Sequence, residues 1–419
     1  MLSLAAAVAA VAVVATGCAS SSDSSGSGGS GSVDTSVLGP DNKATGTPVK
    51  VGLFNVEGGT TVSQPAIGDA AEAAAKYAND HLGGLGGHPI EVVRCGDKAD
   101  GASATACANQ FVQEKVVAVV AGQPARADLA APIVMNAGIP WIGSSPSAAP
   151  ELSGTNAFFF GGGFVGSLAG YAQYSKDNNF KKVTLFGPDN PQLVGAVGAV
   201  GKPLFAKVGV DFALSTVPQG TADATSQIQA GLTRKPDATI VVADETVCQS
   251  ILTALQTSGS TVPKMVNSSC VSKPVLDALG DSGIDGAVLF DLGDPIGDNP
   301  EAKLYQAVMK TYAPSSNATG ITPVGYLSML GFIRGAGGGA KAASADLTSP
   351  AGVLSSMKAA KNIPMPIGQG TTFSCDKSAL GSSLIKSTIC TSNVFVTTYK
   401  GTTPGPYKVL DIAGMFAGS

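Results

Sequence analysis

From residue 49 onward, short apolar segments alternate with longer segments in which apolar residues recur at helical spacing. The segment 49–54 is short and rich in β-branched residues, which predicts a strand, and alanines at helical spacing over 67–82 predict a helix. The same alternation predicts strands at 90–94, 116–121 and 139–143, and helices at 102–114 and 125–136. Continuous apolar strands between helices are typical of a parallel sheet that is covered on both faces.

The alternation begins again after the segment 158–161, which reads Phe-Phe-Phe-Gly. Strands are predicted at 182–186, 212–217, 238–243, 264–267 and 287–292, and helices at 165–177, 193–207, 225–233, 247–257 and 274–279. This second series is similar in length to the first, so the fold class is α/β with two lobes.

The order of elements changes after residue 300. Helices are predicted at 301–312, 324–336 and 352–359, followed by strands at 394–399 and 407–410. Helices followed by strands suggest that the chain crosses between the lobes more than once. We expect the first lobe to comprise 48–160 and 293–370, and the second lobe 161–292 and 371–419.

The N-terminus predicts export. Residues 2–16 form an apolar run that is shorter than the roughly 20 residues of a membrane-spanning helix, as is typical of a signal peptide. The run ends in Val14-Ala15-Thr16-Gly17-Cys18, which resembles the bacterial lipobox, whose cysteine is acylated and becomes the new N-terminus. We therefore expect a lipoprotein signal peptide over 1–18 and a lipid on Cys18; an ordinary signal peptide that contains a cysteine is the alternative.

Composition narrows the class of protein further. The segment 19–47 is rich in Ser and Gly and is predicted to be a disordered linker between the lipid and the folded lobes. Only 13% of the 419 residues are charged and the net charge is −4, so the basic surface of a nucleic-acid-binding protein is not expected.

Cysteine usage agrees with export. Of seven cysteines, six remain when Cys18 is assigned to the lipid, and an even number in an exported protein indicates disulfides. Their spacing suggests three local pairs, Cys95–Cys107, Cys248–Cys270 and Cys375–Cys390. The sequence has no CxxC and only two histidines, so a metal site is not expected. No cofactor is expected either.

Catalytic motifs are not found. The chain contains neither a P-loop nor a GxSxG elbow. Residues 161–166 fit GxGxxG, but they lie where the two lobes join, and glycines there are interpreted as a hinge. We therefore expect no enzymatic activity.

Several short segments carry a family pattern in their order and spacing. They are Lys50-Val51-Gly52-Leu53, Ala74 to Asn79 followed by Gly83-Gly84-Leu85-Gly86-Gly87, Glu91 to Asp97, Val117 to Gly122, Gly138 to Ile142 with Pro150-Glu151-Leu152, and Phe373-Ser374-Cys375-Asp376. Together they resemble the branched-chain amino-acid (leucine/isoleucine/valine-type) substrate-binding proteins of ABC transporters.

The resemblance implies the type I periplasmic-binding-protein fold. Two Rossmann-like lobes with parallel central sheets would be joined by a three-crossover hinge and would bind a small-molecule solute in the cleft between them. It also implies a monomer on the extracytoplasmic face of the cell membrane, whose partners are the permease and ATPase subunits of an ABC importer. In open α/β sheets ligands bind beyond the carboxyl ends of the strands, which agrees with a cleft site.

The first-lobe contacts of the family are only partly matched. In the loop 122–126, where the family uses Ser or Thr hydroxyls for the solute carboxylate, this chain offers Gln123 and Arg126. The next loop offers Ser144, Ser145 and Ser147. The alternatives are a solvated helix residue for Arg126 and turn-forming serines.

In the second lobe, Asp244 and Glu245 follow a predicted strand, and Ser269 stands where amino-acid binders carry a carboxylate for the ammonium group. Asp244 or Glu245 could replace that carboxylate, or could instead cap the helix that follows. Asn55, Glu57 and Asp189 also end predicted strands and are weaker candidates.

These observations predict a solute-binding lipoprotein of an ABC importer, with an amino-acid-like or carboxylate/amide solute. A ligand-sensing receptor module and an exported hydrolase are the alternatives. Permease and ATPase genes beside this one would favour the importer, and turnover assays would test the hydrolase.

Overall fold

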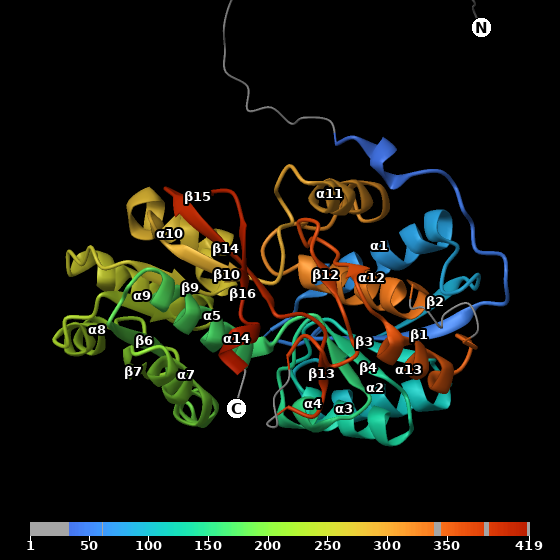
Figure 1. Cartoon of the computed structure of the whole chain (residues 1–419), viewed down its shortest axis with the longest axis horizontal. Coiled ribbons are helices and arrows are strands. Elements are labelled where there is room, and N and C mark those ends of the chain that lie inside the picture. Colours follow the sequence, from blue (N-terminus) through green and yellow to red (C-terminus); the bar gives the residue numbers. More distant parts are fainter. Residues whose placement is uncertain (1–32, 61, 339–344, 381–384, 417–419) are drawn as a thin grey trace, which may run out of the picture. The chain divides into compact units, whose positions relative to one another are not determined.

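The predicted strands form two separate sheets, which Figure 1 shows on opposite sides of the view. The computed structural model describes residues 33–60, 62–338, 345–380 and 385–416. Residues from Val33 onward form a single compact unit. Within the described residues, no helix is both long and apolar enough to cross a bilayer.

The first sheet has six strands in the order β13-β5-β4-β3-β1-β2, and all of them are parallel. Its strands are β1 (Val49–Asn55), β2 (Ile90–Gly96), β3 (Ala118–Ala121), β4 (Trp141–Gly143), β5 (Ala157–Phe159) and β13 (Thr388–Ile389). Its helices are α1 (Pro65–Tyr77), η2 (Ala78–Leu82), α2 (Gly101–Gln113), α3 (Ala127–Asn136) and α4 (Ala149–Ser153), together with the later α11 (Pro300–Tyr312), α12 (Pro323–Gly338) and α13 (Pro350–Ala359).

The second sheet has eight strands, of which the five from β6 to β10 are parallel to one another. They are β6 (Lys182–Pro188), β7 (Asp211–Val217), β8 (Ala238–Val241), β9 (Lys264–Val266), β10 (Val288–Asp291), β14 (Asn393–Lys400), β15 (Thr403–Pro404) and β16 (Lys408–Asp411). The helices of this lobe are α5 (Gly163–Asp177), α6 (Pro191–Ala196), η3 (Val197–Gly201), α7 (Lys202–Lys207), α8 (Thr225–Leu232), α9 (Glu245–Thr257), η4 (Ser268–Val271), α10 (Lys273–Ile284) and α14 (Ala413–Phe416). A two-stranded ribbon joins β11 (Ile363–Pro364) to β12 (Thr372–Phe373).

Each sheet is buried on both faces, as the continuous apolar strands predict. In β1 the side chain of Leu53 packs with the cluster that contains α1 and α12, whereas its neighbour Phe54 packs with the cluster that contains α2 and α3. All of the described side chains of β3 are buried. Because neighbouring strand residues face opposite sides of a sheet, both faces need helices to cover them.

The chain passes between the sheets three times. The passages lie between β5 and α5, between β10 and α11, and between β13 and β14. They are the three crossovers that the type I periplasmic-binding-protein fold has, and the fold class predicted from the sequence is confirmed.

Two predicted boundaries differ from the structure. Residues 33–47 were expected in the linker, but η1 (Thr35–Leu38) buries Leu38 against the first lobe, and the backbone N–H of Asn42 donates to Asp80 O at 2.7 Å. The segment from residue 371 was expected in the second lobe, yet β13 pairs in parallel with β5 of the first sheet. The rest of the predicted linker, 19–32, and the signal peptide lie outside the described residues.

The predicted helix at 193–207 is interrupted. It divides into α6, the π-helical segment η3 and α7. Pro203 has no N–H to donate, and Gly195, Gly198 and Gly201 lower the helical preference of this stretch, so a regular α-helical ladder is not maintained.

Candidate functional site

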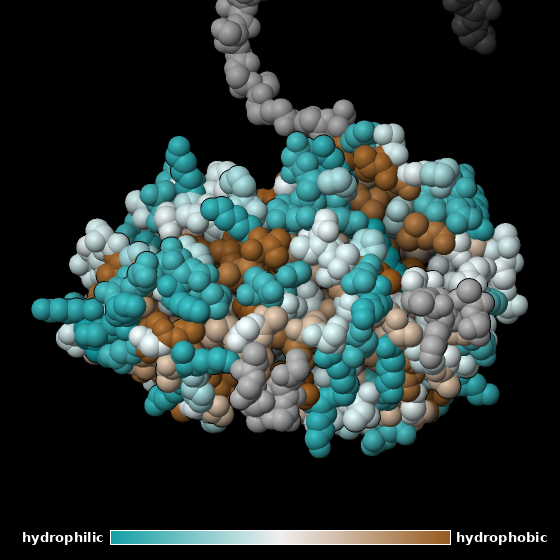
Figure 2. All heavy atoms as spheres, in the orientation of Figure 1, coloured by the Kyte–Doolittle hydropathy of each residue, from teal (hydrophilic) through white to brown (hydrophobic). Residues whose placement is uncertain are grey.

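Among the described residues, a cavity of about 1230 Å³ has walls from both lobes. The first wall consists of residues 62–67, at the start of α1, and the loop before α12. The second wall consists of the starts of α9 and α10, the η4 turn, the end of β10 and the β14–β15 hairpin. In Figure 2 the surface is indented at the top of the view, between the positions of β15 and α11 in Figure 1, and hydrophobic atoms are visible there.

Helix N-termini are the common feature of these walls. α1, α9 and α10 all begin at the cavity. The first turn of a helix has N–H groups without helical partners, and they favour carbonyl or carboxylate oxygens. Two buried side-chain oxygens that line the cavity, Gln64 Oε1 and Ser272 Oγ, also have no hydrogen-bond partner among the described residues.

The first wall is held in place by Arg94 at the end of β2. Its guanidinium forms ion pairs with Glu57 at 2.9 Å and with Asp69 at 2.8 Å, and its Nη2 donates to Pro65 O at 2.8 Å. These hydrogen bonds and charges raise the pKa of Arg94 although its burial opposes the shift. Asp69 also accepts a hydrogen bond from Ser316, which ties the loop before α12 to α1.

The second wall is held by a disulfide. Cys248 in α9 is bonded to Cys270 in η4, with their Cα atoms 5.1 Å apart. The Asn267 amide donates to Ala243 O at 3.1 Å and so joins the same two loops. The cavity residues Asp244 and Ser269 therefore lie on loops that are linked covalently and by hydrogen bonds.

Asp291 is the carboxylate at the inner end of this wall. One of its oxygens accepts a hydrogen bond from Leu292 N at 2.8 Å, and the other accepts a long one from the Tyr407 hydroxyl at 3.5 Å. No basic side chain among the described residues pairs with it. Burial raises its pKa from 3.8 to about 6, and the nearby charge of Asp294 adds to the effect.

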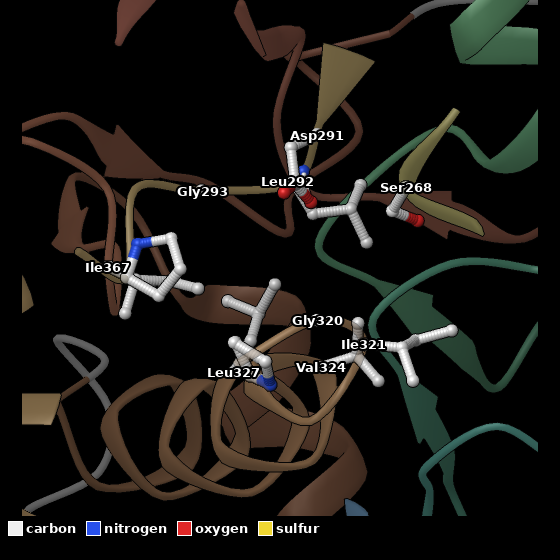
Figure 3. A pocket seen from close by; sticks show the side chains of 11 residues that line it. Ser268, Asp291, Leu292, Gly293, Gly320, Ile321, Val324, Leu327 and Ile367 are labelled. Atoms are coloured by element: carbon white, nitrogen blue, oxygen red, sulfur yellow. Dashed lines mark hydrogen bonds between the residues drawn. The ribbon is translucent and has the colours of Figure 1, made fainter. Parts of the chain in front are cut away.

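Below Asp291 the cavity continues into a small apolar recess of about 20 Å³. Figure 3 shows Asp291 and Ser268 on one side of the recess, and Val324 and Leu327 on the other. Ile321 and Ile367 complete its sides. The recess has about the volume of one water molecule or methyl group, and Asp291 is the charged side chain that lines it.

Three of the candidates predicted from the sequence line the cavity, namely Asp244, Glu245 and Ser269. Asp244 also caps α9, since its carboxylate accepts a hydrogen bond from Val247 N at 2.9 Å. The two interpretations of Asp244 are therefore compatible.

The candidates in the first lobe do not line the cavity, and most form hydrogen bonds or ion pairs within their own lobe. Asn55 is buried and bridges three partners, because its amide donates to Glu57 and Gln64 and its oxygen accepts from the backbone N–H of Gln123. Arg126 forms an ion pair with Asp128 at 3.0 Å. These residues shape the loops at the ends of β1 and β3 rather than the cavity surface.

The serine loop after β4 is also bonded internally. Glu151 Oε2 accepts hydrogen bonds from the backbone N–H and the hydroxyl of Ser147, and Glu151 Oε1 accepts one from the Trp141 indole at 2.8 Å. Ser144 is buried, and neither it nor Ser145 lines the cavity. Asp189, at the end of β6, is exposed and lies outside the cavity lining.

Asp291 and Tyr407 were missed by the sequence reasoning. A signal for Asp291 was present, because it is the acidic residue that ends an otherwise apolar strand, Val-Leu-Phe-Asp. Tyr407 gave no such signal. It directly precedes β16, which pairs with β14, and β14 in turn pairs with β10, so only these antiparallel pairings bring Tyr407 close to Asp291. Among the described residues, no group of three or more His, Cys, Asp or Glu side chains is arranged to hold a metal ion.

Comparisons with known proteins agree with this geometry. The family model described as periplasmic binding protein matches residues 48–400. A comparison with curated protein sequences finds no match.

Solved structures with the same fold are numerous. A leucine-binding protein from Thermotoga maritima is 17% identical, with a TM-score of 0.67, and the match covers 87% of this chain and 99% of that one. A branched-chain amino acid transporter substrate-binding protein from Streptococcus pneumoniae, in complex with isoleucine, is 18% identical, with a TM-score of 0.65 and coverage of 87% and 100%. A fatty acid ABC transporter substrate-binding protein from Thermomonospora curvata is 15% identical, with a TM-score of 0.65 and coverage of 88% and 93%. At these identities the likeness concerns the fold alone.

Proposed function

Since this chain belongs to the periplasmic binding protein family, we propose that it binds a small amino-acid-like or carboxylate/amide solute in the cavity between its lobes and delivers that solute to an ABC importer. The family comprises substrate-binding proteins of transporters, and we propose no catalytic role. The observation that carries the proposal is the cavity itself, whose walls come from both lobes.

The character of the walls supports an amino-acid-like solute. The helix N-termini offer polar contacts, as do the oxygens of Gln64 and Ser272, which have no hydrogen-bond partner among the described residues. Side chains such as Leu276, Ile296 and Ile321 offer an apolar surface. A solute that contacts both walls stabilises the closed arrangement of the lobes, and the permease would recognise that arrangement.

Mass spectrometry of solutes that copurify with the protein tests this proposal, followed by calorimetry with each compound identified. We expect at least one small organic solute to bind with one-to-one stoichiometry and to raise the melting temperature. Binding of no solute, either from the host cell or from a broad metabolite panel, would contradict the proposed function.

We also propose that Cys18 carries the lipid that attaches the protein to the extracytoplasmic face of the membrane. This residue lies outside the described residues, and the proposal rests on its position after the apolar run 2–16. Cys18→Ser should release the protein from the membrane fraction, because it removes the residue that would carry the acyl chains. Lasting attachment depends on having more than one such chain. Wild-type protein that takes up no label from a radioactive fatty acid would rule out the anchor.

A further inference from the structure

The charged side chains that line the cavity are mostly acidic. Among the described residues they comprise four carboxylates, those of Asp244, Glu245, Asp277 and Asp291, and one ammonium group, that of Lys273. Lys273 is already paired with Asp277 at 2.8 Å. The part of the lining that the structure describes contains neither arginine nor histidine. A cavity with this balance concentrates cations and disfavours a solute whose only charge is negative.

Asp291 differs from the other three acids in its surroundings. Asp244, Glu245 and Asp277 are exposed to water, whereas Asp291 is partly buried at the inner end of the cavity. It is paired with no basic side chain of the described residues, and its contacts are the N–H of Leu292 and the distant hydroxyl of Tyr407. A partly buried carboxylate whose two partners are a backbone N–H and a distant hydroxyl retains capacity to accept further hydrogen bonds.

The phenols beside Asp291 suit a cation as well. Tyr407 and Tyr399 both line the cavity and both are almost completely buried. The negative charge of Asp291 adds to the effect of burial in raising the pKa of Tyr399, to about 12, and that of Tyr407. Both phenols therefore stay neutral, and aromatic rings beside a carboxylate are a favourable environment for an ammonium group.

We propose that the solute carries a protonated amine and that Asp291, with Tyr407 beside it, is the residue that binds this amine. The proposal rests on the proposed function and deepens it. Ser269, after β9, stands where amino-acid binders carry a carboxylate for the ammonium group. In this protein Asp291, at the end of β10, would provide that carboxylate instead.

Calorimetry with matched sets of solutes tests the proposal. Each set keeps one branched alkyl group and varies the polar groups attached to it, for example leucine, 3-methylbutylamine, 4-methylpentanamide and 4-methylpentanoate, with further sets built on the copurified solute. We expect the members with an amine to bind and those with only a carboxylate to bind at least tenfold more weakly. Binding of carboxylate-only or amide-only members at equal affinity would overturn the proposal and leave the proposed function intact. Binding of no member of any set would overturn both.

Two variants locate the amine. Asp291→Asn should weaken binding of the best amine tenfold or more, while leaving binding of the hydroxyl analogue of that amine within about threefold of wild type. Tyr407→Phe should weaken amine binding by a few fold. Asp177→Asn, which removes an exposed carboxylate at the end of α5, is the matched control and should change nothing. An amine affinity that Asp291→Asn leaves unchanged would overturn the assignment.

A pH series gives a second readout. The titratable groups that act on Asp291 are Asp294 from the crossover after β10, Tyr399 from β14 and Tyr407 from the segment before β16. Lys273 and Asp277 from α10 line the same cavity and are paired with each other. The part of the lining contributed by the loop before α12 and by α12 itself contains no titratable side chain. We expect amine affinity to fall below pH 6 in wild type, as Asp291 takes up a proton, and to remain nearly constant in Asp291→Asn. An equal fall in both proteins would contradict the role of Asp291.

Discussion

At the scale of single residues, Asp291 has two roles that oppose each other. Its carboxylate is placed where a solute can reach it, and it has no basic partner among the described residues. Burial of an unpaired carboxylate disfavours the folded state, because the charged form loses hydration. The residue that we assign to binding is therefore expected to lower the stability of the protein without solute.

This cost depends on pH in a defined direction. The folded protein raises the pKa of Asp291 from 3.8 to about 6, so the folded state binds the proton more tightly than the unfolded chain does. The contribution of Asp291 to stability is thus most favourable below pH 3.8 and is lost as the pH rises through 6.

We expect Asp291→Asn to raise the free energy of unfolding by about 1–3 kcal/mol at pH 7.5, and we expect this gain to shrink as the pH falls towards 4. Denaturant unfolding of both proteins across this range, with disulfides intact and without solute, measures the effect. Asp177→Asn serves as the control. A gain that does not vary with pH, or a loss of stability at pH 7.5, would show that the charge of Asp291 is not the cause.

Single residues also show where prediction from sequence ended. The sequence correctly showed polar residues near the ends of strands. In the structure, however, Asn55, Arg126 and Ser147 form hydrogen bonds or ion pairs within their own lobe and do not face the cavity. Sequence position does not reveal whether such a group is already satisfied, because the local loop geometry decides whether its polar atoms turn to neighbours such as Asp128 and Glu151 or to the cavity. For Asp291 the reverse holds: only the three-dimensional structure shows that this carboxylate has no basic partner among the described residues and is free to bind solute.

At the scale of elements, α1 and α12 pack against each other directly behind the first wall of the cavity. A Cβ atom at Gly325 of α12 would collide with the backbone carbonyl oxygen of Ile67 in α1. This contact involves backbone on both sides, so the helices can accommodate a larger residue only by moving apart.

We expect Gly325→Ala to lower the free energy of unfolding by about 1–3 kcal/mol and to weaken solute binding, because α1 supplies Ala66 and Ile67 to the cavity. Gly195→Ala in α6 is a suitable control: nothing lies within 4 Å of its new Cβ, and alanine favours a helix, so stability should stay equal or rise by up to about 1 kcal/mol. Thermal unfolding and calorimetry on both variants check the pair. Equal effects would indicate that the α1–α12 contact is not specifically tight.

The disulfides provide a second comparison between elements. Cys95–Cys107, Cys248–Cys270 and Cys375–Cys390 are the pairs in the structure, and they are the ones suggested by spacing. Cys248–Cys270 joins the two turns that carry Asp244 and Ser269, whereas Cys95–Cys107 joins β2 to α2 away from the cavity.

Replacing either pair by serines should cost about 2–4 kcal/mol of stability, since each closes a loop in the unfolded chain. Only Cys248→Ser/Cys270→Ser should also weaken solute binding at temperatures where both variants remain folded. Solute titration of the two double variants, with peptide mapping of the remaining bridges, makes this measurement. Equal affinities in the two variants would mean that the second wall keeps its shape without the bridge.

The sequence predicted which segments form strands and helices more completely than it predicted which of them lie side by side. The alternation of apolar strands and helices located both lobes because it depends on local periodicity. The pairing of β13 with β5 was not predicted, because a two-residue strand has little periodicity and its partner lies far away in the sequence. Residues 33–47 look like linker by composition, but a few apolar side chains such as Leu38 attach them to the first lobe.

At the scale of the whole molecule, three chain passages join lobes that each contribute one wall of the cavity. A solute that contacts both walls binds the closed arrangement more tightly than the open one and shifts the population towards it. How far it shifts depends on the difference between the two affinities, so the strongest effect is expected from a solute that also engages Asp291.

The account depends most on the claim that solute lies between the two walls and contacts both. Hydrogen exchange with and without the best-binding solute tests it directly. We predict slower exchange at the start of α1 and in the loop before α12 on the first wall, and at the starts of α9 and α10 on the second, with little change around the Cys95–Cys107 bridge. Protection confined to one wall, or centred on the loops 122–126 and 144–147 instead, would contradict it.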